Sequence, residues 1–443
     1  MKISLSEHFT YGKLFRFVLP SVIMMVFTSI YGVVDGLFVS NFVGKTAFAA
    51  VNLIMPLLMG ISSVGFMIGT GGCALVTKTL GEGQHEKAEK YFSMLIYTTV
   101  ISGIIISIIT HIVLVPVLKL MGATESLMND CIIYGRILIT FQTAFMLQNV
   151  FQSFFAAAEK PRLGLLMTVA AGMTNIVLDA LFVGVFRWGV AGAAAATVMS
   201  QIVGGVVPLF YFARKNSSLL RIVKPEFHGK MLLKACTNGS SEMLTSISSS
   251  LVSTLYNLHL MELAGENGVA AYGVLMYVNF IYVAIFIGYA IGSAPIVGYN
   301  YGAANHKELK NILRKSLITI GVTGIVLTTA AELLAAPMST LFVGYDRELF
   351  ELTKNGFRLY SFCFLINGFN IFGSSFFTAL NNGAVSAAIS FMRTLVFQII
   401  VISIMPALFG INGIWISVTA AELLSLAVTL IFLITNRKKY NYA

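Results

Sequence analysis

Twelve long apolar stretches restrict this chain to a narrow set of folds. Each exceeds 20 residues, and a helix of about 20 residues spans the ~30 Å hydrocarbon core of a bilayer. A segment in lipid must satisfy its own backbone polar groups, which favours an α-helical bundle. A transmembrane β-barrel would need many short alternating strands, a pattern that this sequence lacks. The predicted spans are 14–39, 47–76, 92–116, 131–157, 163–186, 189–213, 233–262, 268–298, 313–337, 353–379, 384–408 and 411–435.

The sequence also repeats itself. A shift of 221 residues, half of the 443, aligns Gly44 with Gly265 and Gly81 with Gly302 without a gap. Each copy contains six predicted helices, and an even number returns the chain to the side on which it began. Parallel repeats of this kind are one of the two arrangements found in secondary transporters. We therefore predict an all-α polytopic membrane protein with 12 transmembrane helices in two parallel six-helix lobes, related by pseudo-two-fold symmetry.

A polar segment separates the two copies. It contains Arg214, Lys215, Asn216 and Pro225, residues typical of a connection. The predicted organisation is an N-lobe over residues 1–213, a cytoplasmic inter-lobe linker over 214–232 and a C-lobe over 233–443. We expect a substrate cavity between the lobes.

The distribution of charge indicates orientation. The chain is 57% hydrophobic and 11% charged, with a net charge of +10, whereas soluble domains are about 25% charged. Most of the 29 Lys and Arg residues fall in connections on the side of the N-terminus, which by the positive-inside rule predicts that both termini are cytoplasmic.

The first stretch is too long for a signal peptide. We expect a monomer in a bacterial-type plasma membrane, with the lipid bilayer and no nucleic acid as partner.

Enzyme motifs are not supported. Gly44-Lys45-Thr46 resembles the end of a phosphate-binding loop, but Val39 stands where that motif needs glycine. The four cysteines lack paired spacing, the six histidines lack metal-ligand spacing, and no nucleophile–base–acid set stands out. We expect no enzymatic activity, no cofactor and no disulfide.

Acidic residues inside predicted helices are the main functional candidates, because a charge at the bilayer centre costs roughly 2.5–3.5 kcal/mol on insertion scales. Asp35 lies in the first helix and Asp179 in the fifth, where Asn175 precedes it by one turn on the same face. Thr197 lies at similar depth in the sixth helix. These oxygen ligands suit Na⁺, while burial beside a second carboxylate favours holding a proton. The set predicts a site for H⁺ or Na⁺.

The repeat provides an internal comparison. The four positions hold Asp35, Asn175, Asp179 and Thr197 in the first copy and Tyr256, Val396, Ile400 and Val418 in the second. An architectural role would be expected in both copies, so the difference favours an ion site in the N-lobe alone. The alternative is that each acid is a satisfied polar group beside a water-filled cavity.

Other polar residues in the spans have less specific interpretations. Glu422 could pair with Arg393 as a structural contact, and Glu332 lies near a helix end where it can reach water. Glu242 and Gln152 could line the substrate cavity.

Taken together, these features resemble the multidrug and toxic compound extrusion (MATE) family, and within it the MepA-like bacterial branch. The resemblance rests on the two six-helix lobes and on the polar set from Asp35 to Thr197. It rests also on the helix-ending segments 81–85 and 298–303, which read GEGQH and GYNYGA. It covers the whole chain.

The resemblance implies a secondary antiporter that exports amphipathic cationic drugs in exchange for H⁺ or Na⁺. In the family, the positions that match Asp35, Asn175, Asp179 and Thr197 carry the coupling ion. Tyr134 matches a tyrosine linked to that network, and Gln152 matches a position near substrate. An acid that some members carry on the seventh helix is not clearly matched, since Ser249 stands near its place, about two turns from Glu242.

Two other functions stay open at this point. A flippase for lipid-linked oligosaccharides would want a cationic cavity, whereas these spans carry acids and one arginine, Arg393. A membrane scaffold or receptor would transport nothing.

Overall fold

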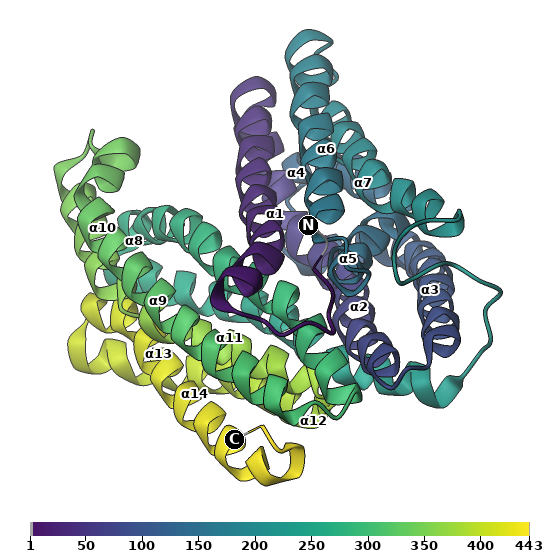
Figure 1. Cartoon of the computed structure of the whole chain (residues 1–443). Coiled ribbons are helices and arrows are strands. Elements are labelled where there is room, and N and C mark those ends of the chain that lie inside the picture. Colours follow the sequence, from purple (N-terminus) through teal and green to yellow (C-terminus); the bar gives the residue numbers. More distant parts are fainter. Residues whose placement is uncertain (1–2, 443) are drawn as a thin grey trace.

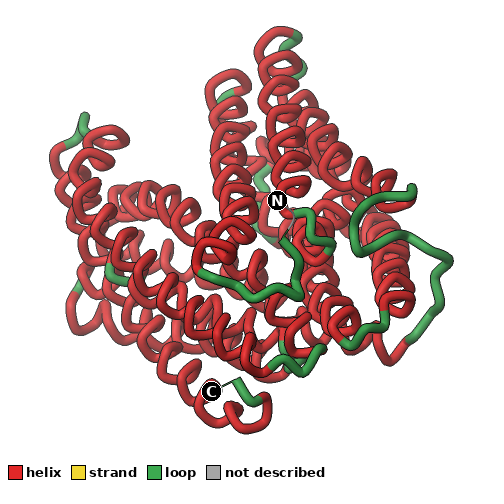
Figure 2. Tube along the Cα trace, viewed as in Figure 1, coloured by secondary structure: helices red, strands yellow, loops and turns green. Residues whose placement is uncertain are grey.

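The structure is a computed structural model that describes residues 3–442; residues 1–2 and 443, at the outer ends of the predicted lobes, lie outside the described residues. Helices joined by short loops make up almost all of the described chain (Figures 1 and 2). The first lobe contains α1 (Tyr11–Phe38), η1 (Val39–Val43), α2 (Lys45–Gly81), α3 (His85–Leu120), α4 (Glu125–Thr140), α5 (Gln142–Ala157), α6 (Pro161–Asp179), η2 (Ala180–Val185) and α7 (Gly189–Ala213). The second contains α8 (Gly229–Gly302), α9 (His306–Val343), α10 (Arg347–Ser361), α11 (Phe364–Ala379), α12 (Gly383–Phe391), η3 (Met392–Val396), α13 (Phe397–Phe409) and α14 (Ile411–Tyr440).

The predicted twelve-helix, two-lobe fold is confirmed, and α8 contains two of the predicted spans. Its 74 residues include Gly265, whose φ of 58° and ψ of −148° lie outside the helical region. The rings of Tyr256 and Tyr272, on either side of Gly265, stack with their centroids 5.6 Å apart, so the two arms of α8 run antiparallel. In the first lobe the aligned residue, Gly44, also has a positive φ (122°) and separates η1 from α2. The repeat thus places a chain reversal at the same point of each lobe.

Two predicted spans are not straight. Residues 131–157 form α4 and α5, bent by 58°, and residues 353–379 form α10 and α11, bent by 49°. Neither bend has a proline or glycine in the residues between its two helices, where Phe141 in the first and Phe362-Cys363 in the second interrupt the helical bonding. Hydropathy marks both stretches as apolar but contains no signal for the bends.

The lobes meet on one side of the bundle, where α1 begins and α2 and α14 end, which we call the terminal side. Here Gly71 of α2 lies against the backbone of Ala235 and Gly239 in the first arm of α8, with no room for a Cβ atom. In the same way, Gly288 in the second arm lies against the backbone of Val22 in α1. Away from this side, the purple-to-teal and green-to-yellow helices diverge towards the end where α6 ends and α10 begins (Figure 1).

The residues that precede α1 form a strap across the terminal side and bind both lobes. In the first lobe, Glu159 accepts hydrogen bonds from the Ser4 hydroxyl (2.7 Å) and the Leu5 backbone N–H (2.8 Å). In the second, Glu308 accepts one from the Phe9 backbone N–H (2.9 Å). The side chains of Leu5 and Phe9 are fully buried. Residues 4–9 therefore join the lobes through two buried carboxylates.

The connection between the lobes lies along α3. Residues 214–228 are not helical. The Val223 backbone N–H donates to the Ser93 hydroxyl (2.8 Å), and Lys90 forms a salt bridge with Glu226 (2.7 Å). This connection is thus attached to the first lobe.

Candidate functional site

Asp35 and Asp179 each lie in the last turn of an α-helix that continues as π-helix. Asp35 lies in the last turn of α1, ahead of η1, and Asp179 is the last residue of α6, ahead of η2. The two π-helical segments pack against each other, as do α1 and α6. Such segments are rare and often occur at functional sites. The two acids therefore lie where the contact between α1 and α6 passes into the contact between η1 and η2.

The structure brings the five residues of the predicted ion site together. The Asp35 carboxyl group interacts with the side chains of Asp179, Asn175 and Thr197, and the Tyr134 hydroxyl interacts with Thr197 and lies near both acids. Asp179 and Tyr134 are fully buried, and Asn175 and Asp35 are 1% and 7% exposed. These polar groups, which come from α1, α4, α6 and α7, therefore share one enclosed place.

The polar atoms of this cluster lack hydrogen-bond partners. Both carboxylate oxygens of Asp179, both amide atoms of Asn175, the Tyr134 hydroxyl and one oxygen of Asp35 are buried without a partner of good geometry among the described residues. Buried polar atoms are rarely left in this state. The Thr197 hydroxyl donates to the Ala193 carbonyl (3.0 Å) and so can only accept from, or ligate, another group. The cluster is thus rich in acceptors and short of positive charge.

The donor set fits a proton or a hard monovalent cation. No three His, Cys, Asp or Glu residues converge within the described part of the chain, which gives no support for a transition-metal centre. Carboxylate, amide and hydroxyl oxygens are the ligand types of hard cations. Two neighbouring carboxylates can equally hold a shared proton.

The aligned place in the second lobe lacks the acids of the first. Tyr256, which aligns with Asp35, is buried, and its hydroxyl donates to Gln398 Oε1 (2.9 Å). The other aligned positions hold Val396, Ile400 and Val418. A hydrogen-bonded tyrosine among these apolar side chains brings no negative charge to hold a cation, so the asymmetry seen in the sequence persists in space.

The second lobe has a different polar centre, and the predicted pairing of Glu422 with Arg393 is confirmed. Arg393 Nε lies 2.9 Å from Glu422 Oε1, and its Nη2 donates to Asn367 Oδ1 (2.6 Å). Asn370 Nδ2 donates to Glu422 Oε2 (2.7 Å). Each charge is therefore both paired and hydrogen-bonded, the condition under which a buried ion pair is tolerated.

The other singled-out residues have distinct surroundings. Glu332 is half-buried and accepts a hydrogen bond from the Ser361 hydroxyl (2.5 Å), so it does not simply extend into water. Glu242 is half-buried on the first arm of α8, within electrostatic range of Arg393. Gln152 is 5% exposed on α5, with its Oε1 unpartnered among the described residues. A role for Glu242 and Gln152 at a substrate cavity stays a prediction.

Sequence reasoning missed two residues beside the acids. Tyr31 lies one turn before Asp35 on α1 and interacts with both Asp35 and Gln148 of α5. Gln148 is buried against Gly204 of α7. The four-residue spacing of Tyr31 and Asp35 was an available signal for a shared helix face. Only the packing of α5 against α7 reveals Gln148.

Comparisons with known proteins match both halves of the chain. The model of the MatE family matches residues 20–181 and 242–404, one match in each repeat. The multidrug export protein MepA of Staphylococcus aureus (strain MSSA476) is 24% identical over 426 residues, which cover 95% of this chain and 93% of that protein. MepA of Staphylococcus haemolyticus (strain JCSC1435) is 23% identical over 434 residues, covering 97% and 95%.

Solved structures share the fold. A multidrug resistance MATE family transporter of the MOP superfamily, in an outward-facing conformation, superimposes with a TM-score of 0.92 at 22% identity, covering 98% of each chain. The Vibrio cholerae MATE transporter VcmN, as a mutant, superimposes with a TM-score of 0.90 at 19% identity, again covering 98% of each chain.

Proposed function

Because the chain belongs to the multidrug and toxic compound extrusion (MATE) family, we propose that it is a secondary antiporter. It exports amphipathic, cationic drugs or toxic compounds in exchange for H⁺ or Na⁺. The proposal places the coupling-ion site at Asp35, Asn175, Asp179 and Thr197, with Tyr134 beside it. It takes the class of cargo from the multidrug export proteins that the chain resembles.

One observation carries the coupling proposal. A pair of buried acids, with oxygens that lack partners among the described residues, occurs in the first lobe, while the aligned positions of the second lobe are apolar or satisfied. Two carboxylates cannot remain buried, adjacent and unpaired at low cost, because burial and mutual repulsion both disfavour their charged forms. Uptake of H⁺ or Na⁺ offsets that cost, so occupancy of the site carries a large free energy that can be coupled to movement.

The arrangement of the lobes suggests how coupling operates. The basic residues on the terminal side support a cytosolic location for that side by the positive-inside rule. Lobes that pack together there and diverge opposite then correspond to a carrier closed towards the cytosol. Entry of the ion from outside favours the state that releases substrate, and its release inside resets the carrier. Ion and substrate thereby act on one conformational equilibrium.

Cationic cargo fits the charges available within the spans. Glu242 is half-buried, and the nearby cation Arg393 is already held by Glu422 and Asn367. Because Arg393 is already paired and Glu242 has no such partner among the described residues, these charges favour binding of a cation over binding of a pyrophosphate. A flippase for lipid-linked oligosaccharides would instead need free positive charge. Binding of a cationic dye, with no binding of a lipid diphosphate, separates the two.

Substrate efflux from proteoliposomes under separately imposed pH and Na⁺ gradients tests the function. Efflux driven by one gradient alone identifies the ion. Absence of flux under either gradient, in protein that remains monodisperse, rules out the antiporter and favours the scaffold.

Asp35→Asn and Asp179→Asn test the site. Each variant is expected to abolish gradient-driven efflux while the protein stays folded. Glu348→Gln, which neutralises an exposed acid on α10, is the matched control and should transport normally. Normal efflux by both aspartate variants would place the ion site elsewhere.

A further inference from the structure

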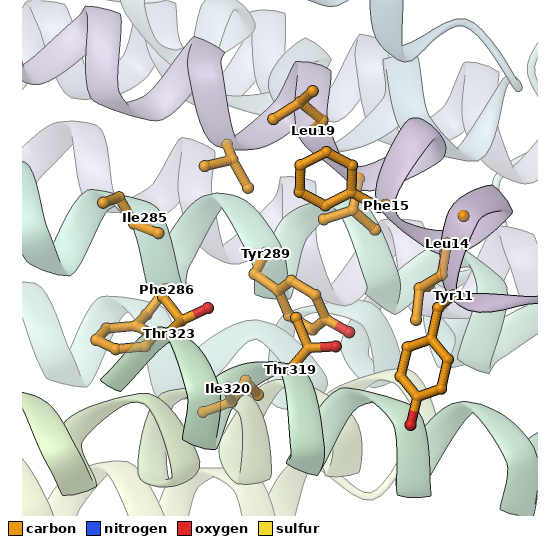
Figure 3. A pocket seen from close by; sticks show the side chains of 13 residues that line it. Tyr11, Leu14, Phe15, Leu19, Ile285, Phe286, Tyr289, Thr319, Ile320 and Thr323 are labelled. Atoms are coloured by element: carbon orange, nitrogen blue, oxygen red, sulfur yellow. The ribbon is translucent and has the colours of Figure 1, made fainter. Parts of the chain in front are cut away.

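A cavity lies between the lobes on the terminal side, away from the acid cluster. It has a volume of about 450 Å³ and is formed by α1, the second arm of α8 and the first half of α9. Phe15 and Leu19 of α1 face Ile285 and Tyr289 of α8 across it (Figure 3). The lining is almost entirely apolar apart from a few hydroxyls, among them Thr319 and Thr323, one turn apart on α9. We call this space the α1–α9 groove.

The groove opens towards the membrane. Phe15, which lines it, is 59% exposed. Ile318 and Val322 on the adjoining face of α9 are 46% and 56% exposed. In a chain that spans a bilayer, exposed apolar side chains of this kind face lipid. The occupant therefore comes from the membrane.

The length of the groove matches one leaflet. Its lining on α1 runs from Tyr11 to Val22, which at 1.5 Å per residue is about 16 Å. Half of a ~30 Å hydrocarbon core is about 15 Å. A single acyl chain that enters at Tyr11 and ends near Val22 would fill the groove.

The mouth of the groove is basic. The Lys315 ammonium lies 5.4 Å from the centre of the Tyr11 ring and donates to the Phe9 carbonyl (2.6 Å). It forms no salt bridge with an acid in the described chain. Glu308, the acid that binds the strap, is occupied by His8, Phe9 and Asn311. Exposed Arg16 follows Phe15 on α1. The positive charge at this level is thus available to an anionic headgroup.

We propose that the α1–α9 groove binds an anionic phospholipid of the terminal-side leaflet, with one acyl chain between α1 and α8 and the headgroup at Lys315. One wall belongs to the first lobe and the other walls to the second. The bound lipid therefore stabilises the present arrangement of the lobes, and movement that separates α1 from α8 releases it. This inference requires neither the proposed coupling ion nor the proposed substrate.

Tryptophan quenching by brominated phospholipids tests the site directly. Phe15→Trp places a reporter in the groove, and Ile318→Trp places one on the lipid-facing surface of α9 at a similar level. Trp188, which is 54% exposed, is replaced by Phe in both, and Trp415, which is 1% exposed, is a buried background common to both. Each protein is reconstituted in neutral phosphatidylcholine containing a small fraction of brominated phosphatidylglycerol or brominated phosphatidylcholine.

The reporter at position 15 is expected to prefer the anionic lipid about fivefold, the effect of one basic residue near an anionic lipid. The reporter at position 318 should show no preference. Lys315→Gln, which keeps a donor for the Phe9 carbonyl, should remove the preference, whereas Lys310→Gln, at an exposed lysine one and a half turns away, should keep it. Equal quenching by both lipids at position 15, or equal effects of the two lysine variants, would overturn the proposal.

Discussion

Gly81 and Gly302 each lie against the backbone of the opposite lobe. A Cβ atom on Gly81 would overlap the Tyr299 carbonyl oxygen, and one on Gly302 would overlap the Lys78 carbonyl oxygen. The 221-residue shift aligns Gly81 with Gly302 and Lys78 with Tyr299. The two contacts are therefore one contact made twice about the pseudo-two-fold axis, and they hold the terminal side closed.

Gly81→Ala is expected to open this side. Forcing a methyl group into a closely packed position costs about 1–3 kcal/mol, which moves the equilibrium between closed and open lobes by about fivefold to a hundredfold. Spin labels at positions 85 and 306, both exposed and aligned by the repeat, should report a larger population of long distances. Gly60→Ala, in open space on α2, should leave the distances unchanged; identical distributions for the two variants would contradict this role for Gly81.

Removing one partner of the Arg393–Glu422 ion pair should destabilise the protein more than removing both. Arg393→Met leaves Glu422 buried without its cation, and loss of one partner of a buried pair costs about 3–5 kcal/mol. Removing both charges together costs much less by the same argument. Thermal unfolding in detergent should therefore rank Arg393→Met well below the double variant Arg393→Met/Glu422→Met. A double variant no more stable than the single one would mean that packing, and not charge, sets the loss.

The strap is expected to detach when its anchor on the second lobe is removed. Glu308→Ala deletes the acceptor for the Phe9 backbone N–H and for His8. A cysteine placed at the fully buried position 9 should then react with a maleimide at least severalfold faster, measured after Cys236 is replaced by Ser. Glu351→Ala removes an exposed acid that pairs with Lys354 on α10 and should not change the rate. Unchanged labelling in Glu308→Ala would show that the apolar side chains alone hold the strap.

The inter-lobe connection should stay attached down to mildly acidic pH. The hydrogen bond from Lys90 lowers the pKa of the Glu226 carboxyl group below its ordinary value of 4.5. Since the folded-state pKa is depressed, the contact is complete above pH 4.5 and is lost only as the pH falls through the lowered value. Hydrogen exchange of residues 214–228, corrected for intrinsic rates, should change little between pH 7 and pH 5.

Lys90→Gln should accelerate that exchange at neutral pH, because Glu226 loses its salt bridge to α3. Lys87→Gln, which changes an exposed lysine one turn from the contact, is the control. Equal exchange in the two variants would assign the attachment to the Val223–Ser93 hydrogen bond instead.

The spans could be predicted because each must be apolar over a length that crosses the hydrocarbon core of the bilayer. This is a local property that hydropathy measures directly. The bend between α4 and α5 could not be predicted, since no proline or glycine stands at Phe141. The strap could not be predicted either. Residues 3–10 are too few to show a period, and their partners Glu159 and Glu308 are far away in sequence.

The residues of the candidate site that could be predicted are those whose transfer into lipid costs the most free energy. Asp35 and Asp179 attract notice as acids in apolar helices, and the repeat distinguishes them from Tyr256 and Ile400. Tyr134 followed from the family resemblance, and Tyr31 and Gln148 were missed. Their polarity is moderate enough to be common in membrane helices, so only proximity to Asp35 makes them notable.

The sequence by itself determined the number of spans, the parallel repeat and the lobe that holds the acids Asp35 and Asp179. These properties depend on the transfer of individual segments and side chains into lipid, which is a local quantity. Only the tertiary structure decided that Arg393 also contacts Asn367, that Gly81 and Gly302 close the terminal side, and that α1 and α9 leave a groove one leaflet long. Each of these depends on the relative placement of helices from distant parts of the chain, and the hydropathy of any one helix contains no information about its neighbours.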